Sequence, residues 1–79
     1  MRPKEFEQVT HVLGKDQPEY IALPTHVNTE DPAVPMTCCF ELTEEEAQKI
    51  AATREIWYRQ LTFGNAFHPM HLQADNPFV

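Results

Sequence analysis

Two cysteines and four histidines are the side chains whose types best suit metal or thiol chemistry: Cys38, Cys39, His11, His26, His68 and His71. Zinc ligands come in closely spaced sets that converge on one point. Adjacent residues of an extended segment point to opposite faces, and the histidines match no zinc spacing. We therefore predict no metal site and reduced, unpaired thiols.

Nucleophilic catalysis would need Cys38 or Cys39 beside an activating histidine and an orienting group. The sequence indicates no such assembled set and contains no Gly-rich phosphate loop. A glutamate cluster at 44–46 is explained by a helix start. We expect no catalytic residue, no cofactor and no enzyme activity. A small thiol enzyme is kept as the third of three functional alternatives, after the two binding functions given below.

Four aromatic residues lie close together in the sequence, between positions 57 and 67, and they are the basis of the other candidate site. In a chain this small most of them should fill the core, and any left over would form a surface for a partner or ligand. An arginine between them could contact an anion or a base. The candidate binding residues are Trp57, Tyr58, Arg59, Phe63, Phe67, His68 and Met70.

A helix over about residues 43–54 must position this cluster. Thr43 followed by Glu46 three residues later is a capping box, and acidic residues in the first turn suit the helix dipole. Its apolar stripe of Ala47, Ile50 and Ala51 is narrow and built from small residues. Such a helix should lie close against a sheet.

Alternating apolar and polar residues predict strands on both sides of the helix, at 34–42 and 56–63. A shorter strand is expected within 8–13, followed by a turn at Gly14-Lys15-Asp16. Prolines should keep 17–24 extended along a sheet rim, and 28–32 looks like the tip of a hairpin arm. Gly64-Asn65 predicts another turn.

We therefore predict one α+β domain over 1–79, with a three- or four-stranded antiparallel or mixed sheet and the helix packed across it. Residues 1–7 and 73–79 should be loosely ordered tails. The expected core is Trp57, Leu61, Phe63, Phe40 and Ile50. A chain of 79 residues buries a small core, so we also expect self-association as a dimer or a higher oligomer.

Net charge and hydropathy exclude several classes of partner. Six basic against twelve acidic residues give a net charge of −6, which repels nucleic acid and anionic lipid. No apolar run approaches the roughly 20 residues that span a bilayer, and no signal peptide is apparent. We expect a cytoplasmic protein that binds neither nucleic acid nor membrane.

Several short motifs resemble a family of small uncharacterised phage and prophage proteins, over about residues 15–72. They are Gln17-Pro18-Glu19-Tyr20 with Leu23-Pro24, Cys39-Phe40-Glu41-Leu42-Thr43 with Glu46, Ile56-Trp57, and Leu61-Thr62-Phe63-Gly64 with Pro69. The family has Cys-Trp where this chain has Cys39-Phe40, and Thr-Gly where it has Thr53-Arg54. Its Pro-Leu-Gln-Pro is replaced by Ala66-Phe67-His68-Pro69.

The resemblance implies a phage accessory protein in the host cytoplasm, and it supplies no site residues. We expect a non-catalytic protein that binds a host protein, as an inhibitor of host defence. The alternative is an oligomeric sponge that sequesters a small nucleotide-like signal between subunits. In that case Arg54, Arg59 and the aromatic residues would contact the ligand.

Overall fold

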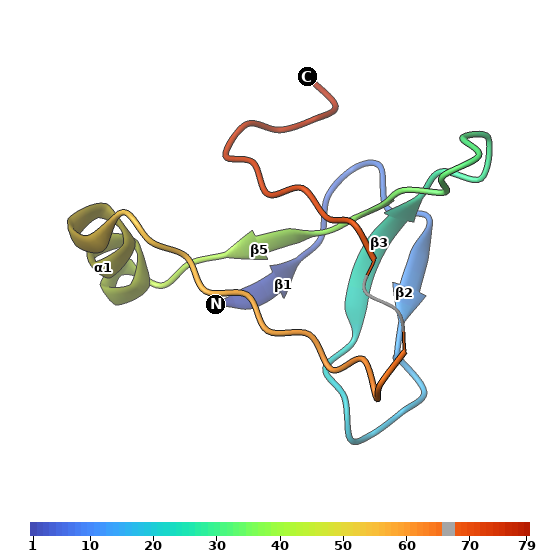
Figure 1. The fold of residues 1–79 in the computed structure, drawn as a ribbon, viewed down its shortest axis with the longest axis horizontal. Coiled ribbons are helices and arrows are strands. Elements are labelled where there is room, and N and C mark those ends of the chain that lie inside the picture. Colours follow the sequence, from blue (N-terminus) through green and yellow to red (C-terminus); the bar gives the residue numbers. More distant parts are fainter. Residues whose placement is uncertain (66–67) are drawn as a thin grey trace.

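The computed structural model describes residues 1–65 and 68–79, and within them it contains one helix and two small antiparallel sheets (Figure 1). The elements are β1 (Arg2–Lys4), β2 (His11–Leu13), β3 (Leu23–Val27), β4 (Met36–Thr37), β5 (Cys39–Glu41) and α1 (Glu44–Thr53). The predicted α+β class is confirmed.

The larger sheet has the strand order β2-β3-β4, so it has three antiparallel strands, within the predicted three or four. Its central strand β3 begins with Leu23 and Pro24, which were expected along a sheet rim. The strand expected within 8–13 is confined to β2, and it turns at Gly14, whose positive φ of 75° suits glycine. The loop between β3 and β4 is closed by a 3.1 Å hydrogen bond from the Asn28 N–H to the Pro35 carbonyl. The predicted hairpin tip at 28–32 therefore lies in this loop.

The smaller sheet pairs β1 with β5, and Pro3 lies opposite Phe40 (Figure 1). The segment 34–42 was expected to be one strand, but it is divided at Cys38 between the two sheets. Its first part pairs with β3 and its second with β1. Residues 2–4, expected in a loosely ordered tail, form β1 because β5 offers them an edge to pair with.

Helix α1 has the predicted capping box at Thr43 and ends at Arg54, which adopts the left-handed conformation (φ 57°). The prediction that it packs across a sheet is wrong. It lies beyond the ends of β1 and β5 (Figure 1), and none of its residues is buried. Its stripe of small residues buries too little apolar area to hold it on a sheet face, and only Ile50 and Glu46 are half-buried.

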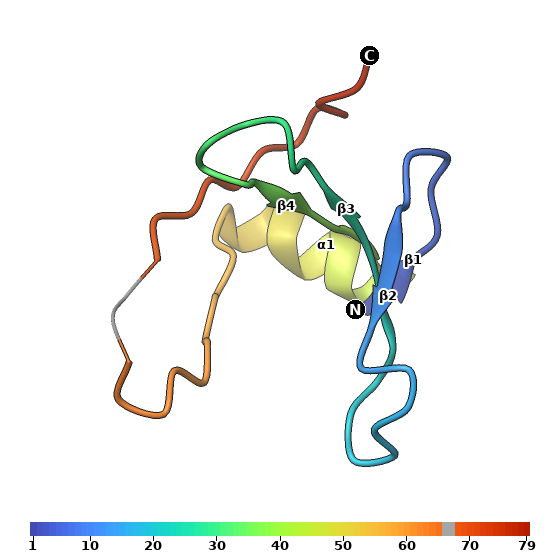
Figure 2. The same cartoon turned by 90° about the vertical axis from the view of Figure 1, so that its right-hand side faces the viewer.

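The strand predicted at 56–63 is not formed in this single chain. The segment is extended but unpaired, and it swings away from both sheets in Figure 2. The predicted core is also wrong, because Trp57 is 88% exposed, Phe63 83%, Leu61 71% and Phe40 50%. Alternation gives a segment two faces, but a strand forms only where a second strand supplies the ladder of hydrogen bonds.

The centre of the molecule is small and partly polar. Thr25 is completely buried, and its hydroxyl donates to the Leu23 carbonyl at 2.9 Å. Among the described residues no Leu, Ile, Val, Met or aromatic side chain is buried. The last segment, expected to be loose, is anchored by the half-buried Phe78, whose ring centroid lies 6.0 Å from Phe6 and 5.0 Å from His26.

Candidate functional site

The aromatic candidate residues lie on the loop between α1 and the C-terminal segment, which projects from the body of the molecule (Figure 2). Trp57 and Phe63 are the most exposed, Tyr58 is 50% exposed and Met70 46%. Arg59 and His68 are also exposed, whereas Phe67 lies outside the described residues. The structure thus places the described candidates on one surface loop, not in a core.

The tip of this loop is a tight turn with Phe63 at an unusual backbone conformation. Phe63 has φ 52° and Gly64 has φ 82°, and the Asn65 N–H donates to the Thr62 carbonyl at 3.0 Å. The turn was predicted from Gly64-Asn65, but a left-handed phenylalanine was not. This conformation is costly for a residue with a bulky side chain, and such strain often marks functional positions.

A shallow open depression of about 200 Å³ lies at the tip, lined by Gln60, Leu61, Thr62, Phe63, Asn65 and His68. The lining is mostly polar and uncharged. Neither Arg54 nor Arg59 lines it, so in the described part of the chain the expected nucleotide contacts are not gathered around one pocket. Between α1 and the tip, the Tyr58 hydroxyl donates a hydrogen bond to Gln60 Oε1 at 2.8 Å.

The two thiols are unpaired and lie in different surroundings. Cys38 is half-buried with its Sγ 3.5 Å from the Thr25 hydroxyl, and Cys39 is exposed on β5. The two histidines nearest to the sheets are engaged elsewhere: His11 Nδ1 lies 2.8 Å from the Thr10 hydroxyl, and His26 meets Phe78 edge to face. The described residues include no cluster of three or more potential metal ligands.

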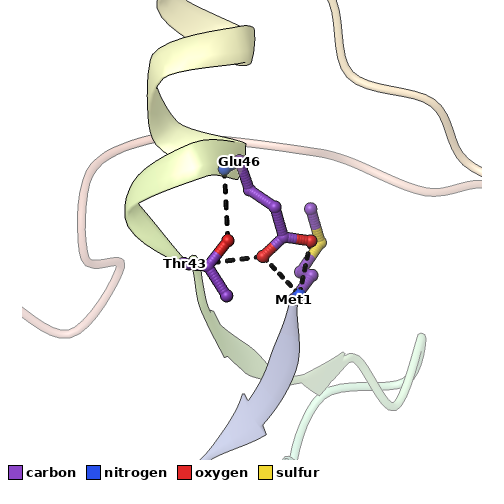
Figure 3. Close-up of polar contacts among 3 residues, drawn as sticks. All are labelled: Met1, Thr43 and Glu46. Carbon is purple, nitrogen blue, oxygen red and sulfur yellow. Dashed lines mark hydrogen bonds and ion pairs between the residues drawn. The ribbon is translucent and has the colours of Figure 1, made fainter.

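One polar cluster was only half foreseen from the sequence. The Glu46 carboxylate accepts from the Thr43 N–H at 2.9 Å, as a capping box requires, and it also forms an ion pair with the Met1 ammonium group (Figure 3). The ammonium group, followed by the Thr43 N–H, lowers the pKa of Glu46. This contact joins the start of β1 to the first turn of α1, and no short-range sequence pattern could have indicated it.

A second surface feature was not predicted as a site. An open groove of about 500 Å³ lies on the sheets, and it is lined by Arg2, Pro3, Glu5, Val12, Ile21, Ala22 and Pro24. Its lining is mostly apolar, and Ile21 is 80% exposed. The available signal was the apolar stretch 20–23 between two prolines, which was interpreted only as an anchor to the core.

No protein-family model matches this chain, and searches of characterised proteins and of solved structures also found no match. In the described residues no helix is both long and apolar enough to span a membrane. Function must therefore be argued from the chain's own surfaces.

Proposed function

We propose that this chain is a non-catalytic binding protein that presents the tip of its projecting loop to another protein. The observation that carries the proposal is Phe63, a phenylalanine that is 83% exposed and held in a left-handed turn. An exposed aromatic ring at the apex of a loop is suited to insert into a pocket of a partner, as binding hot spots do. The neighbouring amide groups of Gln60 and Asn65 would supply a polar rim.

The partner that we propose is a host protein, and the chain would act as a phage accessory protein that inhibits host defence. This choice of partner is supported by the resemblance of residues 15–72 to small phage proteins. A binding role is favoured over the thiol enzyme because the Cys38 thiol contacts the Thr25 hydroxyl at 3.5 Å and neither thiol has a histidine partner among the described residues. No observation favours the nucleotide sponge over a protein partner.

The experiment is affinity purification of the tagged chain from bacterial host cells, followed by a binary affinity measurement with any stoichiometric partner. Phe63→Asn is the informative variant, because asparagine tolerates the left-handed conformation and so keeps the turn while removing the ring. Phe40→Ala is the control, since it removes a half-exposed phenylalanine from β5, away from the loop.

We expect Phe63→Asn to weaken the binary complex at least about tenfold, which corresponds to about 1.4 kcal/mol, and Phe40→Ala to bind as the wild type does. Equal affinity of Phe63→Asn and the wild type would contradict the proposal. A released nucleotide in place of a protein partner would favour the sponge.

A further inference from the structure

The single chain exposes far more surface than a compact protein of its size. Its accessible surface is 7327 Å² for a mass of 9.2 kDa, whereas a folded monomer of this mass exposes about 4900 Å². The excess of roughly 2400 Å² exceeds the about 800 Å² that each partner buries in a standard interface, and it suits an obligate dimer. The radius of gyration, 14.1 Å, is likewise larger than the about 12 Å expected for a compact chain of this length.

Part of this excess belongs to residues 56–61, which we call the stem of the loop. The stem alternates as a strand does, with Trp57, Arg59 and Leu61 on one face. No strand of the described residues pairs with it. A segment with this pattern and without a partner is suited to join the sheet of another chain by strand addition.

The groove on the sheets offers an apolar site of matching character. Val12, Ile21 and Pro24 line it, whereas no residue of the stem does. In Figure 2 the segment that follows α1 lies to one side of both sheets, so the stem does not fill the groove of its own molecule. Strand β2, which contributes Val12, is an outer strand of the order β2-β3-β4, and no other strand in the part of the chain that the structure describes pairs with its outer edge.

Charge also favours contact between the stem and residues 1–53, which we call the body. Residues 1–53 contain four basic and ten acidic side chains, a net charge of −6, while residues 54–65 contain two arginines and one glutamate, a net charge of +1. Placing a stem on a body therefore brings opposite charges together. The groove itself is lined by one basic and one acidic residue, Arg2 and Glu5, so the attraction comes from the body as a whole, and Glu5 is the lining residue that Arg59 could meet.

We propose that two copies of this chain exchange their stems, so that the stem of each copy lies in the groove of the other. The arrangement has two identical contacts related by a two-fold axis. It covers Trp57, Leu61 and Ile21, which are among the most exposed apolar side chains of the single chain. The stem ends at Leu61, so Phe63 in the turn that follows is not part of the contact, and this inference does not depend on the ring that carries the proposed function. Gln60 and Leu61 belong both to the stem and to the depression at the tip.

The test is reciprocal complementation between two variants. The stem variant Trp57→Ser/Leu61→Ser has an intact groove, and the groove variant Val12→Asp/Ile21→Asp has an intact stem. Three of the four altered side chains are largely exposed in the single chain (Trp57 88%, Ile21 80% and Leu61 71%), whereas Val12 is 37% exposed. Val79→Asp, at a fully exposed side chain in the C-terminal segment, is the control.

In sedimentation equilibrium we expect the wild type, Val79→Asp and Phe63→Asn to be dimers at micromolar concentration. Each of the two designed variants alone should associate at least about tenfold more weakly, and their equimolar mixture should regain a dimer with one intact stem-to-groove contact. Regained structure in the mixture would support the proposal even if a single variant is unfolded alone.

Fluorescence gives a second measurement, because Trp57 is the only tryptophan. In the mixture only the groove variant carries it, so adding the stem variant should shift its emission to the blue. A wild type that stays monomeric would overturn the proposal. This holds whether the emission of Trp57 is red, as for an exposed stem, or blue because the stem has docked in the groove of its own chain. A stem variant that dimerises as tightly as the wild type, or a mixture that fails to associate, would also overturn it.

Discussion

Glu46 combines two roles at one carboxylate. It completes the capping box with Thr43, and it pairs with the Met1 ammonium group at the start of β1. Because the helix buries no side chain against the sheets, this cluster is one of the few described contacts between α1 and the rest of the chain. The ionised form of Glu46 therefore stabilises the position of the helix as well as its first turn.

This arrangement predicts a dependence of stability on pH. The Met1 ammonium group lowers the pKa of Glu46 below its ordinary value of 4.5, so its contribution is complete above pH 4.5 and is lost as the pH falls through the lowered pKa. Glu46→Gln keeps a capping acceptor but cannot ionise. In urea unfolding followed by circular dichroism, it should be less stable than the wild type at neutral pH and equal to it in strong acid.

The control is Glu45→Gln, the same change one residue earlier, where the carboxylate is bonded to neither Thr43 nor Met1. It should show no comparable convergence with the wild type at low pH. A difference between Glu46→Gln and the wild type that is constant across the pH range would mean that the ion pair contributes nothing.

At the scale of elements, the sequence predicted correctly those features that depend on interactions between residues close together in the chain. Thr43 and Glu46 are three residues apart, and the turn at Gly14 needs only its own backbone, so both were predicted correctly. The segment 56–63 has the alternation of a strand, but pairing depends on a distant edge. The exposed loop was therefore expected to form a core strand, and the role of its aromatic residues as a binding surface stays a prediction.

The end of α1 offers a test at this scale. Arg54 has φ 57°, and its N–H donates to the Ile50 carbonyl at 2.7 Å. The left-handed conformation costs a residue with a side chain about 1–2 kcal/mol in the folded state. Glycine removes this cost, but it also loses more conformational freedom on folding, so only part of the gain remains. Arg54→Gly should therefore raise the free energy of unfolding by about 0.5–1 kcal/mol.

Arg54→Ala separates strain from charge, because alanine removes the guanidinium group but keeps the left-handed penalty. In urea titrations it should be no more stable than the wild type. If alanine and glycine stabilise the chain equally, the gain would come from charge, and strain at the helix end would not be the cause.

At the scale of the whole molecule, the chain lacks the apolar burial that usually offsets conformational entropy. Its one fully buried side chain in the described region is a threonine, while folding still costs about 1–2 kcal/mol per residue in backbone entropy. The dimer that we propose would resolve this imbalance, because the apolar surface that the single chain exposes would become a shared core.

Stability should then depend on protein concentration. For a dimer that unfolds to two separate chains, each hundredfold increase in concentration adds about 2.7 kcal/mol per dimer to the folded state. The urea midpoint of the wild type should therefore rise measurably between roughly 1 and roughly 100 µM, followed by the emission of Trp57. The stem variant Trp57→Ser/Leu61→Ser, followed by circular dichroism, should have a low midpoint that does not change with concentration. If the midpoint of the wild type is equally constant, folding is complete within one chain, and the exposed apolar side chains of the loop need another explanation.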